Sequence, residues 1–231
     1  MATDALRIAL CQIAPIWLQR DATLGKVADW IDRSARENCE LIIFGEALVP
    51  VYPFWVERTS GAEFESALQK SLYAHYVSQA VCTEDGDLDI VCQAAALYAQ
   101  GEDLHVAIWP GNLRNTEDVT RHIARESRSF VASVSGLMRR QDIADQLPHA
   151  ELLREVADDI MANGGSCLAA PNGDWILQPE IDTESLRVAE IEHRLVLEER
   201  HSLDVAGHYS RPDVTRLIVN RKRQTTAEFV D

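Results

Sequence analysis

Apolar and polar positions alternate along the first half of the chain in a way that predicts a strand, a helix and a second strand. Apolar residues dominate 6–13, and the short run LIIF at 41–44 is typical of a central strand covered on both faces. Between these runs, apolar positions recur at helical spacing over 22–38, and Asp21 is placed to cap that helix. We therefore expect a right-handed βαβ unit.

The pattern continues with further strands and helices. We predict helices at 63–81, 88–100, 115–128 and 147–161. We predict strands at 104–110, 130–134, 166–170, 175–178, 186–191 and 215–219. The double glycine at 164–165 is expected to stop the last helix, and Pro-Asn-Gly at 171–173 to turn a hairpin. The alternation of the two element types indicates an α/β protein.

The first strand–helix–strand unit delivers one carboxylate, that of Glu46, directly after the 41–44 strand and Gly45. Ligand sites of α/β proteins lie at the carboxyl ends of their strands, and partial desolvation there would raise the pKa of a glutamate toward that of a general base. An aromatic and proline-rich loop follows at 50–55. Glu46 is therefore the candidate catalytic residue, with a solvated strand-end glutamate as the alternative.

Composition limits the class of protein and its partners. A chain of 231 residues without a Pro-, Gly- or Ser-rich linker is expected to form a single domain over 1–231. No apolar run is long enough for a membrane span and the N-terminus lacks a signal-like core, which favours a cytoplasmic location. The net charge of −15 argues against nucleic acid and anionic membranes as partners.

The cysteines give no sign of a disulfide framework or a metal site. Their number is odd and no CxxC or CxxH spacing occurs, so reduced thiols are expected. These residues are Cys11, Cys39, Cys82, Cys92 and Cys167.

Four stretches together resemble the nitrilase branch of the carbon–nitrogen hydrolases. They read FGEALVPVYPFW at 44–55, ALYAQGEDLHVAIWPG at 96–111, TRHIARESRSFV at 120–131 with NGGSCLAAPNG at 163–173, and GHYSRPDV at 207–214. The resemblance implies an αββα sandwich. It also implies a Glu-Lys-Cys triad that needs no metal or organic cofactor, and hydrolysis of a nitrile to a carboxylic acid and ammonia. Glu46 falls where the base glutamate of that family lies.

The other two triad members do not appear where the resemblance requires them. The family's lysine lies in an RKLxPT-like strand and its cysteine in a CWE turn, both before the stretch at 96–111, and neither motif occurs here. The lysines are Lys26, Lys70 and Lys222, on two predicted helices and in the basic tail. Because the flanking motifs are kept, we expect an internal deletion near 95–96 that leaves the sandwich incomplete in its central strands. We also expect 221–231 to be a mobile tail.

Several other residues are weaker candidates. Cys82 precedes Glu84 in VCTED, but it follows a predicted helix instead of an apolar strand, so a nucleophilic role is disfavoured. Tyr52, Trp55 and Trp109 are candidate substrate-binding residues, with aromatic packing as the alternative.

Two functional hypotheses therefore remain. The first is a nitrilase acting on a small-molecule nitrile. The second is a catalytically silent or shortened relative that serves as an assembly partner, since the resemblance also implies self-association into dimers or spiral oligomers. A module that only binds ligands at Glu46 is a third and weaker reading.

Overall fold

The computed structural model describes residues 5–80, 101–214 and 218. The predicted helix at 88–100, Cys82, Cys92, the deletion point near 95–96, the strand at 215–219 (apart from residue 218) and the tail at 221–231 lie outside the described residues. No helix of the described part is both long and apolar enough to span a bilayer.

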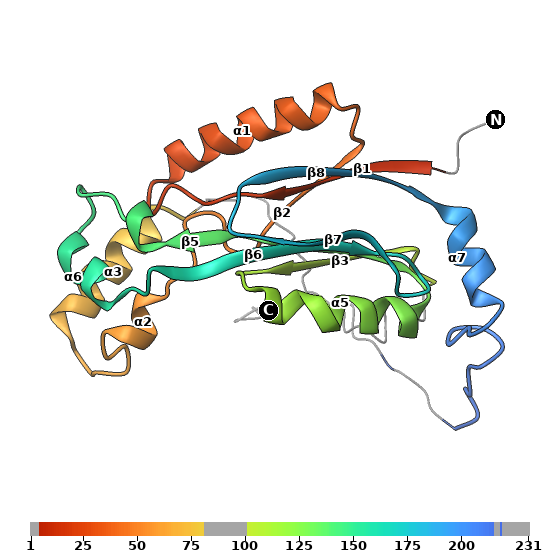
Figure 1. Ribbon diagram of the computed structural model, residues 1–231. Helices are drawn as coiled ribbons and strands as arrows, with labels where there is room; N and C mark the ends of the chain where they lie inside the picture. Colours follow the sequence, from red (N-terminus) through yellow and green to blue (C-terminus); the bar gives the residue numbers. More distant parts are fainter. Residues whose placement is uncertain (1–4, 81–100, 215–217, 219–231) are drawn as a thin grey trace, which may run out of the picture.

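The strands form two sheets that pack face to face (Figure 1). The first sheet has the order β2-β1-β8, with β1 at Ala5–Gln12, β2 at Leu41–Phe44 and β8 at Ser185–Glu192. The second has the order β3-β4-β6-β5, and β7 also pairs with β6. Its strands are β3 (Leu104–Trp109), β4 (Phe130–Ser135), β5 (Leu137–Arg139), β6 (Ile160–Ala169) and β7 (Trp175–Ile181).

One long helix covers the outer face of each sheet, which makes four layers (Figure 1). Helix α1 (Arg20–Arg36) packs Trp30 and Val27 on Cys11 of β1 and on Ile13, which directly follows that strand. Helix α5 (Leu113–Ser127) packs on β3, β4 and β6 of the second. Between the sheets lies an apolar core that includes Ile8, Leu10, Ile43, Phe130 and Leu168. The predicted αββα sandwich is therefore confirmed.

Both βαβ units have parallel strands. Strands β1 and β2 are parallel, with Ile8 opposite Leu41, and strands β3 and β4 are parallel, with Leu104 opposite Phe130. The predicted elements are confirmed here, although α1 begins at Arg20 and α5 at Leu113. Asp21 therefore lies in the first turn of α1 instead of capping it, and α5 begins directly after Asn112.

The prediction for 147–161 was wrong in its second half. Helix α6 covers Ala150–Val156, and β6 begins at Ile160. The double glycine lies inside β6, where Gly164 and Gly165 have φ of +89° and +99° beside a register shift. A Cβ on Gly164 would stand 2.4 Å from Gln12 Nε2, and one on Gly165 would stand 2.8 Å from Thr116 Oγ1. These glycines therefore allow a β-bulge to pass close to β1 and α5 instead of ending a helix.

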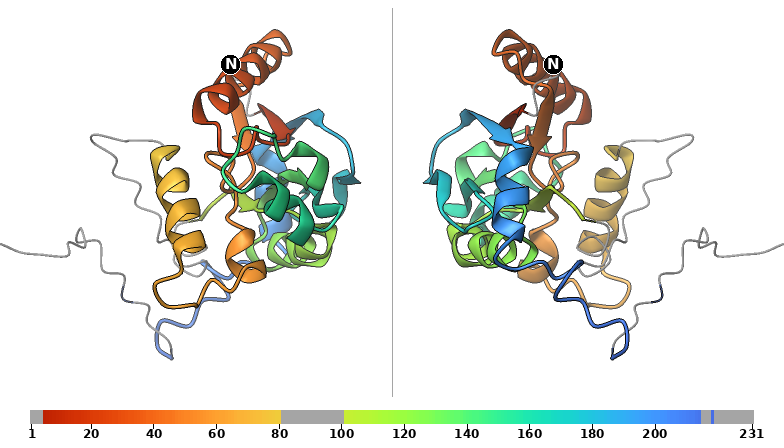
Figure 2. Two further views of the ribbon diagram at one scale, coloured as in Figure 1. Left: turned by 90° about the vertical axis from the view of Figure 1, so that its left-hand side faces the viewer. Right: turned by 90° about the vertical axis from the view of Figure 1, so that its right-hand side faces the viewer.

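A second core closes one end of the sandwich. Trp17 and Phe54 are buried there together with residues of α2 (Trp55–Arg58), α3 (Ala67–Ser78) and α6. Helix α3 stands apart from the sheets (Figure 2) and contacts this core through Leu68, Leu72 and Tyr76. The remaining elements are a short 3₁₀ helix at Arg140–Asp142 and helix α7 at His193–Arg200.

Candidate functional site

Glu46 lies where the carboxyl ends of strands from both sheets meet. Strand β2 ends at Phe44, and the Glu46 backbone N–H donates to the carbonyl of Trp109, the last residue of β3, at 3.3 Å. The Leu137 N–H donates to the Ile13 carbonyl at 3.2 Å, which joins the loop after β1 to the start of β5. The turn after β2 is thus held at the edge of the fold where α/β proteins place their ligands.

Gly45 is required by close packing. A Cβ at this position would stand 2.7 Å from the Gly136 nitrogen and 3.0 Å from the Ser135 carbonyl carbon. The turn that carries Glu46 is therefore pressed against the backbone that leaves β4. A side chain at position 45 would push Glu46 away from the ends of β3 and β4.

We expect Gly45→Ala to destabilise the chain by about 1–3 kcal/mol, because its Cβ would overlap the Gly136 backbone. Gly25→Ala is the matched control, since Gly25 is exposed within α1 and a Cβ there meets nothing within 4 Å. That substitution should stabilise the helix by about 0.5–1 kcal/mol. Urea unfolding with unchanged m values measures both. A Gly45→Ala variant as stable as the parent would show that Gly136 does not constrain this turn.

The Glu46 side chain is exposed and makes no hydrogen bond with the described residues. The desolvation of the Glu46 carboxylate that the sequence led us to expect is therefore not found among the described residues. Its carboxylate is open to solvent.

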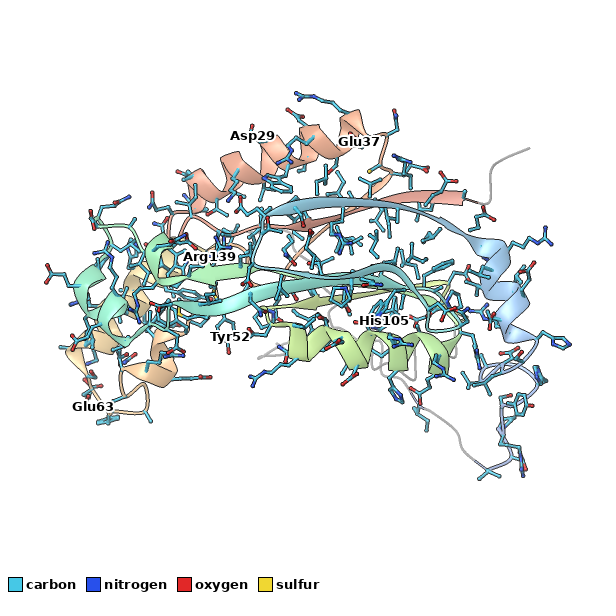
Figure 3. The ribbon with its side chains drawn as sticks, viewed as in Figure 1. Asp29, Glu37, Tyr52, Glu63, His105 and Arg139 are labelled. Atoms are coloured by element: carbon cyan, nitrogen blue, oxygen red, sulfur yellow. The ribbon has the colours of Figure 1, made fainter. Side chains whose placement is uncertain are left out.

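A groove of about 640 Å³ lies beside this strand edge. Its walls include Tyr52, Arg58, Asn112, Asn163 and Met161, and Pro110, which directly follows Trp109, also lines it. Figure 3 shows Tyr52 at this end of the sandwich. The groove therefore combines an aromatic ring and apolar side chains with amide groups, a mixture that suits a small organic ligand.

Hydrogen bonds between backbone and side chains fix the groove walls. Asn163 Oδ1 accepts from the Leu113 N–H at 3.0 Å, at the first residue of α5, and Asn112 Nδ2 donates to the Met161 carbonyl at 3.4 Å. Arg58 pairs with Asp158 on the rim of the groove. The hydrogen bond between the two side chains raises the pKa of Arg58 and lowers the pKa of Asp158. Asn112 and Asn163 were not predicted as site residues, although glycine neighbours in PGN at 110–112 and NGG at 163–165 indicate an irregular backbone at both places.

The structure separates the three aromatic candidates. Tyr52 lines the groove, whereas Trp55 is only 2% exposed and packs edge-on against Phe54 and Tyr76. Trp109 directs its indole toward α5, and its Nε1 donates to Ser133 Oγ of β4 at 3.4 Å. Of the three, Tyr52 therefore has the placement that a ligand-contacting residue needs.

The described cysteines have the environment of inert thiols. Burial raises the pKa of Cys11 and of Cys167 to about 11, and it also raises the pKa of Cys39. At pH 7 a thiol with a pKa of about 11 is a thiolate roughly once in 10⁴ molecules. None of these three groups is therefore prepared for nucleophilic attack.

The described lysines are engaged away from Glu46. Lys26 donates to the Ala14 carbonyl at 2.9 Å and pairs with Glu184, and Lys70 pairs with Glu65. Within residues 5–80 and 101–214, no group of three or more His, Cys, Asp or Glu side chains is arranged to hold a metal ion. Of the triad that the resemblance implies, the described residues contain the glutamate position alone.

Comparison with known sequences identifies relatives. The model of the carbon–nitrogen hydrolase family matches residues 7–93. Arylacetonitrilase from Aspergillus kawachii is 24% identical over 304 positions, covering 92% of this chain and 91% of the relative. Aliphatic nitrilase from Rhodococcus rhodochrous is 22% identical over 322 positions, covering 99% and 82%. Nitrilase 2 of Arabidopsis thaliana is 31% identical over 141 positions, covering 58% and 41%.

These alignments are longer than the chain itself. The Aspergillus alignment has 304 positions but includes about 213 residues of this chain (92% of 231), so about 91 positions have no counterpart here. The Rhodococcus alignment has 322 positions and includes about 229 residues (99% of 231), which leaves about 93. Both relatives therefore carry about 90 residues that this chain lacks.

Solved structures support the fold. The Caenorhabditis elegans NitFhit protein matches with a TM-score of 0.60 at 13% identity, covering 98% of this chain and 70% of the other. A carbon–nitrogen hydrolase from Helicobacter pylori G27 also matches with a TM-score of 0.60, at 14% identity, covering 93% and 100%. These structures show the fold alone, and the sequence relatives show that the chain is similar to nitrilases of the carbon–nitrogen hydrolase family.

Proposed function

We propose that the complete form of this protein hydrolyses a nitrile to a carboxylic acid and ammonia, with Glu46 as its general base. The observation that carries this proposal is the position of Glu46, held by Gly45 and the Trp109 carbonyl at the meeting point of the strand ends in a nitrilase-type sandwich. A carboxylate there can transfer protons to and from a substrate bound over the same edge.

We further propose that the 231-residue chain lacks a central segment of about 90 residues, inserted near 95–96 in the complete form. The unmatched positions of two relatives support this, as does the sheet order. Strands β2 and β3 are consecutive among the described strands, yet each is the last strand of its own sheet. Additional strands beside them would cover Glu46 and supply the cysteine and lysine.

The chemistry assigned to the missing residues follows from the reaction. A thiolate forms a bond to the nitrile carbon, and the nitrogen receives a proton, which gives a thioimidate. One water molecule then displaces ammonia, and a second releases the acid and restores the thiol. In this scheme Glu46 carries the protons and a lysine stabilises the developing negative charge.

An aryl-substituted nitrile is the substrate class that the groove favours. Tyr52 presents a ring beside the site, and Met138 and Met161 add polarizable apolar surface. The test is release of ammonia and acid in a 1:1 ratio by the complete form, with phenylacetonitrile compared with an aliphatic nitrile of similar size. Equal kcat/KM for both would contradict the aryl assignment, and no hydrolysis of either would contradict the function itself.

A further inference from the structure

The side chain of Gln12, the last residue of β1, is fully buried and hydrogen-bonded at both ends of its amide. Its Nε2 donates to the carbonyls of Glu180 at 3.1 Å and Thr183 at 2.9 Å, and its Oε1 accepts from the Ser166 N–H at 2.9 Å. Ser166 lies in β6 and Glu180 in β7, and both strands belong to the second sheet. Since a buried amide is stable only when its donors and acceptor are paired, this side chain has one fixed orientation. Gln12 therefore ties the end of β1 to the second sheet.

Ser166 carries the connection from Gln12 to the end of β4. The regular pairing of β4 with β6 covers residues 131–133 of β4, and Ser135 lies beyond it. There the Ser166 Oγ accepts from the Ser135 N–H at 3.0 Å and donates to the Ser135 carbonyl at 3.4 Å. Both residues are fully buried, so this hydroxyl supplies partners that the backbone of Ser135 needs. The position of Ser135 thus depends on the position of Ser166.

The chain after Ser135 leads back to Gln12. The Leu137 N–H donates to the carbonyl of Ile13 at 3.2 Å, and Ile13 directly follows Gln12. Hydrogen bonds and covalent bonds therefore close a ring, which we call the Gln12 ring. Its members are Gln12, Ile13, Ser135, Gly136, Leu137 and Ser166. Because the ring is closed, a displacement of any member is passed to both of its neighbours.

The turn that carries Glu46 rests on the Gln12 ring. Gly136 is the ring member whose nitrogen would stand 2.7 Å from a Cβ at position 45. Trp109, whose carbonyl accepts from the Glu46 N–H at 3.3 Å, is paired in register with Ser135. Since the Glu46 side chain makes no hydrogen bond with the described residues, these backbone contacts are what hold its carboxylate in place among them.

We propose that Gln12 is a positioning residue for Glu46, which it reaches through Ser166 and Ser135. The inference rests on the proposed function, because a general base must be held close to the proton that it moves. Gln12 is 0% exposed, so its effect on the reaction is transmitted by the backbone instead of by contact with a substrate. A glutamine suits this role because one amide donates to two carbonyls and accepts from an N–H at the same time.

Amide hydrogen exchange of the 231-residue chain tests this path without any enzyme activity. Ser166→Ala removes the hydroxyl that bonds Ser135, so the Glu46 amide should exchange at least about 10-fold faster. Ser34→Ala is the matched control, since it removes an equally buried hydroxyl, bonded to the Trp30 carbonyl at 2.8 Å in α1. The Glu46 amide of this control should exchange within about twofold of the parental rate, because α1 lies outside the Gln12 ring.

Gln12→Met tests the first member of the path, because it keeps the volume of the side chain and removes its hydrogen bonds. It should speed exchange of the Glu46 amide as Ser166→Ala does. The double variant should exchange no faster than the faster single variant, because both substitutions act on one path. If Gln12→Met fails to fold, Ser166→Ala alone decides. Parental exchange rates at Glu46 in these variants, or additive increases in the double variant, would overturn the proposal.

Turnover by the complete form separates this inference from the proposed function. Ser166→Ala should lower kcat by about 10-fold or more and leave KM within about threefold, since a displaced base slows proton transfer without altering the groove. A purely structural role would leave kcat of the folded enzyme at the parental value. An active parent with an unchanged kcat in Ser166→Ala overturns the positioning role, whereas a parent that hydrolyses no nitrile contradicts the proposed function.

Discussion

The 231-residue chain is expected to release no ammonia above the blank from arylacetonitriles or aliphatic nitriles. Hydrolysis by this route needs a thiolate, and loss of a catalytic nucleophile typically costs on the order of 10⁶ in kcat. Burial raises the pKa of Cys11, Cys39 and Cys167, so none of these thiols replaces it. Glu46 alone can move protons but cannot form the covalent intermediate. Ammonia release with the complete form assayed in parallel measures the difference.

Cys82 is the control for this prediction, because it lies outside the described residues and precedes an acidic stretch. If the 231-residue chain does release ammonia, and Cys82→Ala stops the release, then Cys82 is the nucleophile and the missing segment is not needed.

In the complete form, Glu46→Gln should lower kcat by about 10²–10⁴, the usual contribution of a general base. Glutamine keeps the size of the side chain and its ability to hydrogen-bond, but it cannot accept a proton at neutral pH. The fold should be preserved, because the Glu46 side chain is exposed and its structural contact is made by the backbone N–H. Steady-state kinetics with circular dichroism measures both effects.

Glu57→Gln is the matched control for this variant. Glu57 is exposed, as Glu46 is, and it lines the groove beside the strand edge, so the substitution removes one negative charge from a neighbouring position. Its kcat should stay within a few-fold of the parent. Near-normal turnover by Glu46→Gln would show that Glu46 is a solvated strand-end residue and not the general base.

Much of the fold was predictable because local pattern and tertiary structure agree in the two βαβ units. The run at 41–44 is β2, and the helical spacing over 22–38 corresponds to α1. The prediction failed at β6, where Gly164 and Gly165 form a bulge. A helix stop and a bulge both favour glycine, and only the close approach of Gln12 and Thr116 distinguishes them. That approach joins residues far apart in the sequence.

The site was predictable in its position but not in the directions of its side chains. The apolar run and Gly45 located Glu46 at a strand end, although Gly45 is required by contact with Gly136 instead of by an unusual φ. Trp109 follows the strand alternation and turns its indole toward α5, and the chain after Phe54 buries Trp55. The groove is built by Asn112, in the loop before α5, and by Asn163, in β6, and no local pattern contains the contact between these segments.

The central claim is that residues 95 and 96 are not neighbours in the complete protein. Sequencing the encoding DNA and its transcript across these two codons tests it most directly. We expect about 90 additional codons in one reading frame. They should include one cysteine at the end of an apolar strand and one lysine in a preceding strand. A contiguous reading frame through both codons would contradict this proposal and would leave a short chain without the nucleophile that the proposed reaction needs.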